Sequence, residues 1–560
     1  MKQLISEIIQ KALEELNLKL KKEEIEKFIE IPPSTEMGDY AFPCFFIAGK
    51  LKQDPNEIAL ELREKIGSSK KIKDFQDIQT KGSYLNFFLD RKILAINTLN
   101  QILKEKENFG RVNLGEGKKA LIEHTSINPN ASPHVGRARN AIIGDSLVKI
   151  LSFLGFKPEV HYYVNDVSKQ IAMLVFAEAE NLKFEDMLKK YISVAARIKK
   201  SPNLENKIFE LLYKFEHNNP KIVKKFNKIT STCVKGQAKI LSELGIHYDF
   251  FDYESKYLGD SKNILSELEK TKKLFKDENG RFVLDQRGTS IDGQMKTAVL
   301  VLTRSDGTGL YPLRDISYTI EKMKIAEKNI IVLGEDQKLY FQQIKEALNF
   351  LKYKSPEVVH YSFILLNEKG KSKKMSTRRG DVVLLENFLE DAIKKAEKEI
   401  AKRKTKGDAR KVGIGAVKYS ILKNNNNKII NFNLDEALNF EGDTGPYLLY
   451  SYARASSIIR KAKINAKKNF SFEELELKEI DLVKKLSQFP EIVLKSYQSL
   501  NPSLIANYSY QLAQIFNEFY HECQVIGDEK EFFRLNLVET FRIVLKNSLT
   551  LLGIETIERM

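Results

Sequence analysis

The sequence predicts an α/β protein built on a doubly wound parallel sheet, with a smaller α/β module before it and an all-helical region after it. Three observations support this. Short apolar runs typical of buried strands alternate with helical patterns through the middle of the 560-residue chain. A separate mixture of helical and strand-like patterns occupies residues 1–110. From about residue 385 onward the apolar spacing is helical, without strand-like alternation of useful length.

Charge and cysteine usage narrow the class of protein. Lys and Arg outnumber Asp and Glu by 91 to 75, which favours a polyanionic partner, although a generally lysine-rich composition gives the same excess. No apolar run reaches the roughly 18 residues of a membrane span, and no signal peptide is recognisable. Cys44, Cys233 and Cys523 are far apart and form no CxxC pair, which argues against structural zinc and predicts a reducing cytoplasm.

The N-terminal module is expected over residues 1–110, and its aromatic loop is its most informative feature. Helical segments flank a proline-containing loop that leads into Tyr40 and Phe42, and residues 82–88 alternate like a strand. The two aromatic side chains suit stacking on a nucleic-acid base, and they suit core packing equally well as residue types.

The central region alternates between strands and helices, which argues for parallel pairing with crossover helices. Strands are expected at 119–124, 158–163, 297–303, 329–333 and 360–366. The expected domain boundaries are 116–385 for the sheet domain, 386–440 for a helical junction and 441–560 for a C-terminal helical domain. A lysine-rich helical insertion is expected at about 170–245, where a solvated helix face explains any one lysine as well as an RNA contact does.

The stretch from Leu121 to Gly155 reads as a buried strand, a polar loop and a helix that starts near His134-Val-Gly136. A helix N-terminus presents free N–H groups and the positive end of its dipole, so it attracts phosphate. Gly136 allows a ligand to approach the backbone, and His134 places a donor beside it. The sequence therefore predicts a nucleotide site at the carboxyl edge of the sheet. A loop histidine that only caps a helix is the alternative.

A second stretch, residues 373–380, is strongly basic. Its lysines and arginines suit the oxygens of a triphosphate, although a basic surface loop would look the same in isolation. Farther back, Tyr311 and Asp315 stand one helical turn apart on a common face. Gly334 and Glu335 close an expected strand, where a contact with the ribose of a nucleotide is possible.

Together, the segments HVGR and KMST resemble the HIGH and KMSK signatures of class I aminoacyl-tRNA synthetases. The fuller wording, EHTSINPN, HVGRARNAIIGD and KMSTRRGDVV, is similar to arginyl-tRNA synthetases of the archaeal and eukaryotic type, and the resemblance covers essentially the whole chain. It implies a Rossmann-like class I catalytic domain between an N-terminal additional domain and an α-helical anticodon-binding domain. It also implies an arginine–tRNA ligase that uses ATP, with its Mg²⁺, to attach L-arginine to tRNA(Arg), releasing AMP and pyrophosphate. A monomer is expected.

The resemblance also assigns roles to residues. An acidic socket for the guanidinium would include Glu123 and Asp315, with Tyr311 packed beside it and Glu254 as a weaker third carboxylate, while Asn128 and Gln337 would serve the backbone end of arginine. ATP would be held by His134, Gly136, Gly334, Glu335, Lys374 and Met375. The activation chemistry would use His134, Gly136, Arg137, Lys374, Ser376, Arg378 and Arg379. The tRNA would meet Tyr40 and Phe42 at its elbow, and Tyr447, Tyr450 and Arg454 at its anticodon.

Three departures from the family pattern stand out. The second His of HIGH is Arg137, the second Lys of KMSK is Thr377, and the lysine that several members carry before the motif His is Ala131. We hypothesise that Arg137, with Arg378 or Arg379, supplies the missing cation, because an arginine fork suits phosphate oxygens. These losses leave open a non-catalytic tRNA-binding paralogue. The guanidinium socket opposes that alternative, and its paired acids disfavour a synthetase for a neutral amino acid.

Overall fold

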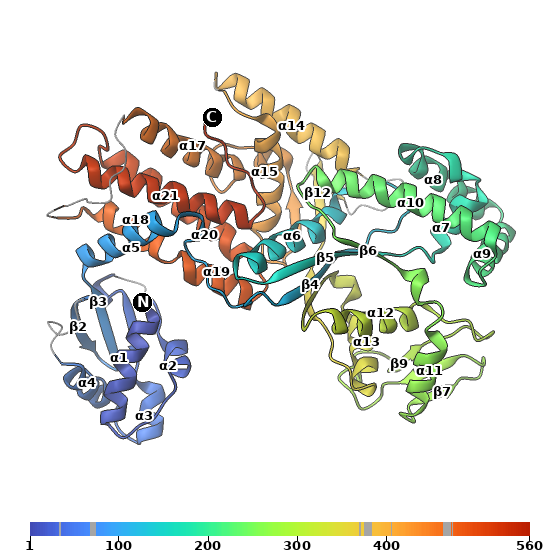
Figure 1. The fold of residues 1–560 in the computed structure, drawn as a ribbon, viewed down its shortest axis with the longest axis horizontal. Coiled ribbons are helices and arrows are strands. Elements are labelled where there is room, and N and C mark those ends of the chain that lie inside the picture. Colours follow the sequence, from blue (N-terminus) through green and yellow to red (C-terminus); the bar gives the residue numbers. More distant parts are fainter. Residues whose placement is uncertain are drawn as a thin grey trace. The chain divides into compact units, whose positions relative to one another are not determined.

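The structure is a computed structural model that describes residues 1–32, 35–67, 74–368, 371–373, 383–404, 406–462, 472 and 474–560 (Figure 1). The chain forms two compact units. The first comprises 1–106, 462–488 and 515–541, and the second comprises 107–461, 489–514 and 542–560. Among the described residues, no helix combines the length and apolarity that crossing a membrane requires.

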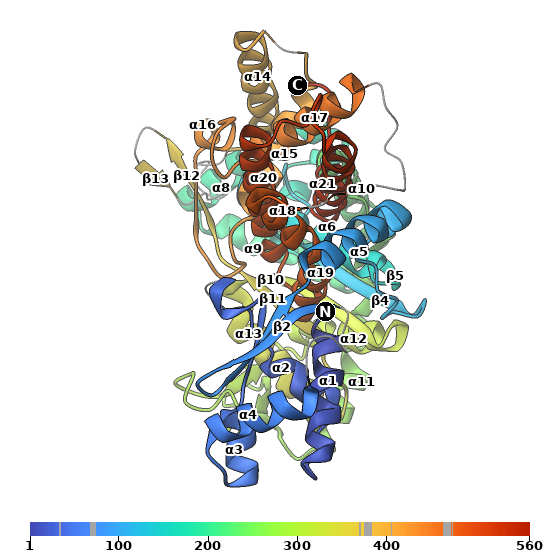
Figure 2. The ribbon, with the colours of Figure 1, turned by 90° about the vertical axis from the view of Figure 1, so that its left-hand side faces the viewer.

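The first unit contains a three-stranded antiparallel sheet in the order β1-β3-β2, seen from the side in Figure 2. Its N-terminal elements are α1 (Lys2–Glu15), α2 (Lys22–Phe28), η1 (Thr35–Met37), β1 (Tyr40–Pro43), α3 (Phe45–Leu51), α4 (Pro55–Ile66), β2 (Phe75–Lys81), β3 (Tyr84–Leu89) and α5 (Arg91–Glu105). The sequence predicted β3 and not its two partners, because β1 is short and β2 is largely polar. Helix α18 (Leu477–Ser487) packs against α5.

The second unit is organised by a five-stranded parallel sheet in the order β11-β10-β4-β5-β6. The strands are β4 (Lys119–Thr125), β5 (Lys157–Val164), β6 (Phe250–Tyr253), β10 (Lys328–Gly334) and β11 (Glu357–Tyr361). From β4 the chain proceeds one way to β5 and β6, whereas β10 and β11 extend the other way. The doubly wound prediction is confirmed, and the order of strands reverses between β4 and β10. Ligands bind at such a switch point, beyond the carboxyl ends of the strands.

Two expected strands lie outside this sheet, which corrects their placement. The run at 297–303 forms β9 (Val299–Val301), which pairs antiparallel with β8 (Phe282–Asp285) in a small sheet whose third strand is β7 (Leu274–Lys276). The run at 360–366 is divided between the end of β11 and β12 (Ile364–Glu368), which pairs with β13 (Lys371–Lys373) and β14 (Ile430–Phe432). Strand β14 also shows that the region after 385 is not purely helical.

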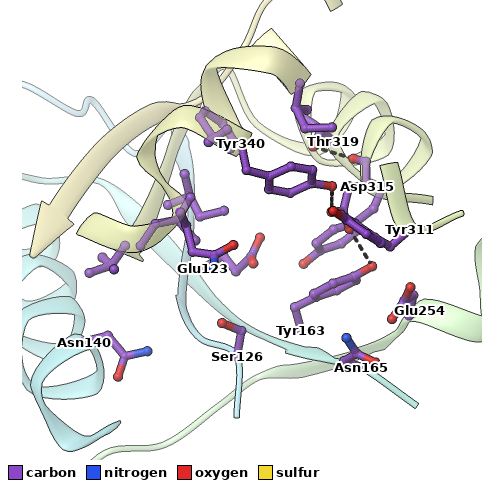
Figure 3. Close-up of a pocket in the computed structure, with 18 of the residues that line it drawn as sticks. Glu123, Ser126, Asn140, Tyr163, Asn165, Glu254, Tyr311, Asp315, Thr319 and Tyr340 are labelled. Carbon is purple, nitrogen blue, oxygen red and sulfur yellow. Dashed lines mark hydrogen bonds between the residues drawn. The ribbon is translucent and has the colours of Figure 1, made fainter. Parts of the chain in front are cut away.

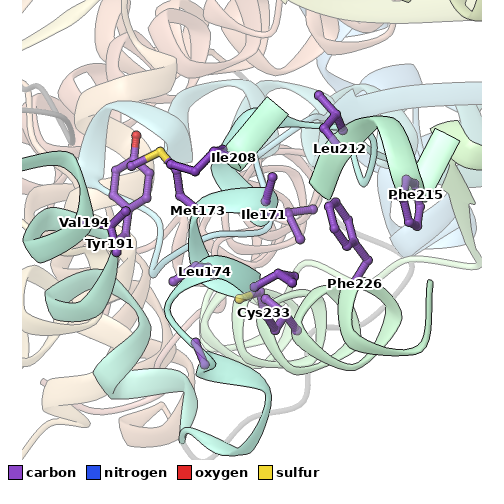
Figure 4. Packing of buried hydrophobic residues seen from close by; sticks show 14 of the residues in the cluster. Ile171, Met173, Leu174, Tyr191, Val194, Ile208, Leu212, Phe215, Phe226 and Cys233 are labelled. Atoms are coloured by element: carbon purple, nitrogen blue, oxygen red, sulfur yellow. The ribbon is translucent and has the colours of Figure 1, made fainter. Parts of the chain in front are cut away.

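Between β5 and β6 the chain forms a helical subdomain with its own core. Its elements are α7 (Lys169–Phe176), η5 (Ala179–Asn181), α8 (Phe184–Lys200), α9 (Asn203–Glu216) and α10 (Pro220–Ser242). Figure 4 shows how buried residues from these helices interdigitate, with Ile171 and Phe226 among them. The lysines therefore occupy the outer faces of helices whose inner faces are apolar.

The remaining elements are mostly helical. Between β6 and β11 lie η6 (Glu254–Tyr257), α11 (Ser261–Glu269), α12 (Tyr311–Ile325), η7 (Glu335–Gln337) and α13 (Lys338–Phe350). The C-terminal half adds α14 (Leu385–Lys402), α15 (Ala409–Leu422), α16 (Leu434–Ala437), α17 (Gly445–Lys461), α19 (Phe489–Gln498), α20 (Ser503–Glu522) and α21 (Glu531–Leu551). The 3-10 turn η3 (Lys106–Asn108) leads into the second unit.

Helix α6 (Ala138–Phe153), preceded by the 3-10 turn η4 (Val135–Arg137), is the element that positions the predicted nucleotide motif. It packs tightly on β4, since a Cβ added at Gly144 would lie 2.1 Å from the Cβ of His124. Gly155, just beyond the helix, has φ +85°, which fits its expected place at the helix end. The Ser146 hydroxyl donates to the carbonyl of Leu551 at 2.8 Å.

Arg139 joins α6 to two distant segments. Its side chain is fully buried, and its two terminal nitrogens donate to five backbone carbonyl oxygens. These acceptors are Ser362, Phe363, Asn425, Asn426 and Lys428. The asparagine run at 424–427, to which the sequence assigned no role, therefore supplies part of this set of acceptors.

We predict that Gly144→Ala lowers the free energy of unfolding of the second unit by about 1–3 kcal/mol, because the new methyl group has no space against His124. Urea unfolding measures the change. Gly49→Ala in α3 is the matched control, since nothing lies within 4 Å of the added Cβ there. The control should be neutral or stabilising, by up to about 1 kcal/mol. Equal stabilities of wild type and Gly144→Ala would contradict the close packing of α6.

Candidate active site

A cavity of about 650 Å³ lies at the carboxyl ends of β4 and β10, at the switch point of the sheet (Figure 3). Every residue predicted to contact the amino acid lines it, namely Glu123, Asn128, Glu254, Tyr311, Asp315 and Gln337. Residues nearly 200 positions apart in the chain therefore meet in one cavity. Arg137 and Gly334, predicted on the nucleotide side, line the same cavity.

Among the three carboxylates predicted to meet arginine, Asp315 is the one that uncharged hydroxyl groups hold in place. Its Oδ1 accepts a hydrogen bond from the Tyr163 hydroxyl at 3.0 Å, and its Oδ2 accepts one from the Tyr340 hydroxyl (Figure 3). Burial raises the pKa of Asp315, and the two phenol donors oppose that rise. Both of these donors are uncharged hydroxyls. A cation that enters the cavity would therefore meet a carboxyl group that neutral partners hold in position.

Glu123 and Glu254 are each already paired. The Lys322 ammonium donates to the Glu123 carboxylate, and both side chains are almost fully buried. The Arg314 Nε donates to Glu254 at 2.6 Å, again between buried side chains. Burial raises the pKa of both glutamates, and the paired cation opposes the rise in each case. Sequence reasoning missed Lys322, although it lies two helical turns beyond Asp315 on the same face of α12.

The other predicted contacts surround these carboxylates. The backbone carbonyl of Asn128 accepts a hydrogen bond from the buried amide of Gln237 at 3.0 Å, which fixes the loop after β4. Gln337 lies in the 3-10 turn that follows β10. Tyr311 is 51% exposed, and its ring centroid lies 5.1 Å from that of Tyr340, so it stands at the rim of the cavity.

The HVGR segment lies beside the residues that follow the basic loop. The Val135 N–H donates to the Val383 carbonyl at 3.1 Å, and the Leu385 N–H donates to the Pro133 carbonyl at 2.9 Å. Of the basic stretch itself, Lys374, Met375, Ser376, Thr377, Arg378 and Arg379 lie outside the described residues. The described chain at Val383 and Leu385 is thus held next to the segment that contains His134.

His134 precedes η4, and its imidazole is largely buried. Burial, helped by the positive charge of Arg137, lowers the pKa of His134 to about 4, so the ring is neutral at pH 7. Its Nδ1 has no hydrogen-bond partner in the described part of the chain. Arg137 itself is exposed and lines the cavity, so it faces both solvent and the site.

At the carboxyl end of β10, Gly334 lines the cavity. There is little room beside it, since an added Cβ would lie 2.5 Å from the Asp336 Oδ1. Glu335 accepts a hydrogen bond from the Ser362 hydroxyl at 2.5 Å. Within the described ranges, no cluster of three or more His, Cys, Asp or Glu side chains is arranged to hold a metal ion.

The predicted tRNA contacts differ in their exposure. Phe42 is fully buried in the first unit, so the prediction that it stacks on a base is wrong, and its role is core packing. Tyr40 on β1 is partly exposed. Tyr447, Tyr450 and Arg454 lie on one face of α17, all partly buried, with the Arg454 guanidinium 4.8 Å from the Tyr450 ring centroid. Their contact with RNA stays a prediction.

Comparisons with known proteins cover the whole chain. Three family models match: the arginyl tRNA synthetase N-terminal domain at 3–89, the catalytic domain of class I (R) tRNA synthetases at 98–435, and the DALR anticodon binding domain at 448–560. The arginine–tRNA ligase of Methanocaldococcus jannaschii is 37% identical, over 98% of each chain, and that of Clostridium perfringens is 34% identical, over 100% of each. The structure of Thermus thermophilus arginyl-tRNA synthetase matches with a TM-score of 0.83 at 26% identity, covering 100% of both chains.

We predict that His134 makes the fold sensitive to acid. Because its pKa in the folded state is about 4 and that in the unfolded chain is near 6.5, only the unfolded chain binds a proton between these values, and stability falls as pH decreases through this window. Replacing His134→Gln should therefore reduce the stability lost between about pH 7.5 and about pH 5 by about 2 kcal/mol. Urea unfolding at both pH values measures this. An identical loss in both proteins would show that His134 is not buried in its neutral form.

Proposed function

The chain belongs to the arginyl-tRNA synthetases and is a class I arginine–tRNA ligase, and we propose that the cavity at its β4–β10 switch point is where it activates arginine. Full-length relatives named as ligases support a catalytic protein over the non-catalytic paralogue that the motif departures left open. The observation that carries the proposal is that Glu123, Asp315, Asn128, Gln337 and Arg137 line a single cavity.

In this proposal, Asp315 binds the guanidinium of arginine. A guanidinium offers parallel N–H donors that match the two oxygens of a carboxylate. Tyr163 and Tyr340 hold Asp315 in place, while Tyr311 packs at the rim beside the substrate. Glu123 and Glu254 contribute to the acidic surroundings with their paired cations, and Asn128 and Gln337 serve the backbone end of arginine. A neutral competitor would leave Asp315 unpaired, which favours selection in one step.

ATP is the second substrate and enters with its Mg²⁺. We assign its α-phosphate to the region of His134 and Gly136, where the neutral imidazole can donate a hydrogen bond, and its ribose to Gly334 and Glu335. The triphosphate would contact the basic loop, through the cations Lys374, Arg378 and Arg379 and through Ser376 and the Met375 backbone. Attack by the arginine carboxylate on the α-phosphate then gives arginyl-adenylate and pyrophosphate. A ribose hydroxyl of the terminal adenosine of tRNA(Arg) next attacks the arginyl carbonyl carbon, which forms the ester and releases AMP.

For the tRNA, we propose that the module at 1–110 meets the elbow through Tyr40, without Phe42, and that the helices of 441–560 hold the anticodon through Tyr447, Tyr450 and Arg454. The proposed boundaries of the intervening parts remain 116–385 and 386–440, with the insertion at about 170–245. We further propose that the enzyme is a monomer and works in the cytoplasm, a reducing compartment that suits its three free, buried cysteines.

We predict that Asp315→Asn raises the KM for arginine about 100-fold, because the charge that the guanidinium meets is lost, while the KM for ATP stays within about twofold. Aminoacylation of tRNA at varied arginine and ATP concentrations measures both values. Asp306→Asn is the matched control, since Asp306 accepts from the Thr308 N–H in an exposed turn and does not line the cavity. An unchanged KM for arginine would contradict the assignment of Asp315.

We predict that Arg137→His leaves the affinity for arginine unchanged and slows adenylate formation about tenfold or more, because a neutral imidazole replaces a cation on the phosphate side. tRNA-dependent ATP–pyrophosphate exchange reports adenylate formation directly. Arg410→His is the control, an exposed arginine paired with Glu243 away from the cavity. If exchange proceeds at the rate of the wild type, Arg137 does not compensate for the missing motif cation.

A further inference from the structure

A cluster of three largely buried side chains lies behind the arginine cavity, and no sequence motif announces it. Its members are His161 on β5, Asp252 on β6 and Tyr318 on α12. The Tyr318 hydroxyl donates to the Asp252 carboxylate at 2.7 Å, and the same carboxylate lies 2.6 Å from the Nδ1 of His161. Of the three, Tyr318 alone lines the cavity, so Asp252 can affect the site through it.

The periodicity of the strands places this cluster beside the residues that hold Asp315. Side chains two residues apart on a strand point to the same face of the sheet, so His161 and Tyr163 share one face of β5. In the parallel pairing of β5 with β6, Tyr163 is in register with Asp252. Asp315 and Tyr318 both reach this face from α12, since they bond to Tyr163 and Asp252 respectively.

A continuous series of contacts therefore links Asp252 to Asp315. The Tyr318 ring stacks on the Tyr163 ring, with the centroids 4.6 Å apart and the planes inclined by 11°. The Tyr163 hydroxyl in turn donates to the Asp315 Oδ1 at 3.0 Å (Figure 3). Because Asp252 fixes the hydroxyl of Tyr318, it also fixes the ring face against which Tyr163 packs. A displaced Tyr318 would shift Tyr163 and, with it, the carboxylate that Tyr163 holds.

We propose that Asp252 is a positioning residue of the arginine site, which fixes Tyr318 and, through the stack of Tyr318 on Tyr163, sets the position of Asp315 for the guanidinium. This inference deepens the proposed function, because it rests on the assignment of the cavity to arginine. It adds a support behind the side chains that meet arginine and replaces none of them.

Two substitutions separate the hydrogen bond of Asp252 from its charge. Asp252→Asn keeps a carbonyl oxygen that can accept from Tyr318 but removes the charge, whereas Asp252→Leu, of similar size, removes both. A role for the charge alone is the alternative, since Asp252 also interacts electrostatically with Lys322 and Glu123. That alternative predicts equal losses in the two variants, whereas positioning predicts a loss mainly in Asp252→Leu.

The experiment measures the KM for arginine and the KM for ATP in tRNA aminoacylation. We expect Asp252→Leu to raise the KM for arginine about tenfold and Asp252→Asn to raise it less than about threefold, while the KM for ATP stays within about twofold in both. Tyr318→Phe should act like Asp252→Leu. In the Tyr318→Phe background, Asp252→Leu should add less than about twofold, because the hydroxyl through which Asp252 acts is already absent.

Several results would overturn the inference. One is a further loss of more than about twofold from Asp252→Leu in the Tyr318→Phe background, and another is an Asp252→Asn variant as impaired as Asp252→Leu. An equal rise in the KM for ATP, or an unchanged KM for arginine in Asp252→Leu, would show that the cluster is only structural. If Asp252→Leu does not fold, Tyr318→Phe decides, since an unchanged KM for arginine there also rejects the proposal.

Tyr419→Phe is the matched control and should leave both KM values unchanged. Tyr419 is a buried tyrosine of α15 whose hydroxyl likewise donates to an aspartate, Asp443, but it does not line the cavity. Asp315→Asn tests the proposed function separately, because an unchanged KM for arginine in that variant would reject the arginine site itself and not only the role of Asp252.

Discussion

The site depends on the guanidinium of Arg139, which holds three separate parts of the second unit together. Its donors reach the backbone carbonyls at 362–363, where β11 ends, and at 425–428, between α15 and β14. Burial lowers the pKa of Arg139 to about 10, so the group remains charged at pH 7, and each carbonyl bond is charge-assisted. This arrangement fixes the start of α6 relative to the strand ends, and with it the HVGR segment beside the cavity.

Buried charged groups that are satisfied by partners are also found at the amino-acid end of the cavity. Buried ions are stable only when partners satisfy them, so an acidic socket cannot consist of free carboxylates before its ligand arrives. The protein solves this with Lys322, Arg314 and two tyrosine hydroxyls, which hold Glu123, Glu254 and Asp315 in position. The nucleotide end differs, since its histidine is neutral and its predicted cations are Arg137, which lines the cavity, and those of the basic loop.

Sequence reasoning succeeded where a local pattern determined the structure. The strands β4, β5 and β10 are apolar runs buried on both faces, and their parallel pairing follows from the helices between them. Sequence reasoning failed where the surroundings of a residue in the fold, and not the local pattern, determine its structure. Strand β6 carries aromatic residues that are partly exposed at the sheet edge, so its sequence lacks the signal of a buried strand. Phe42 and Tyr40 are both aromatic and are close together in the sequence, but the fold buries Phe42 and leaves Tyr40 partly exposed.

The contact between Ser146 and the carbonyl of Leu551 has a consequence for how the protein is made. These residues are 405 positions apart, so the ribosome must deliver nearly the whole polypeptide before the helix that carries the nucleotide motif can complete its packing. Contacts of such long sequence separation form late and slowly. A nascent chain that has already built its sheet therefore still exposes one flank of that helix, and this interval is when chaperone engagement would matter most.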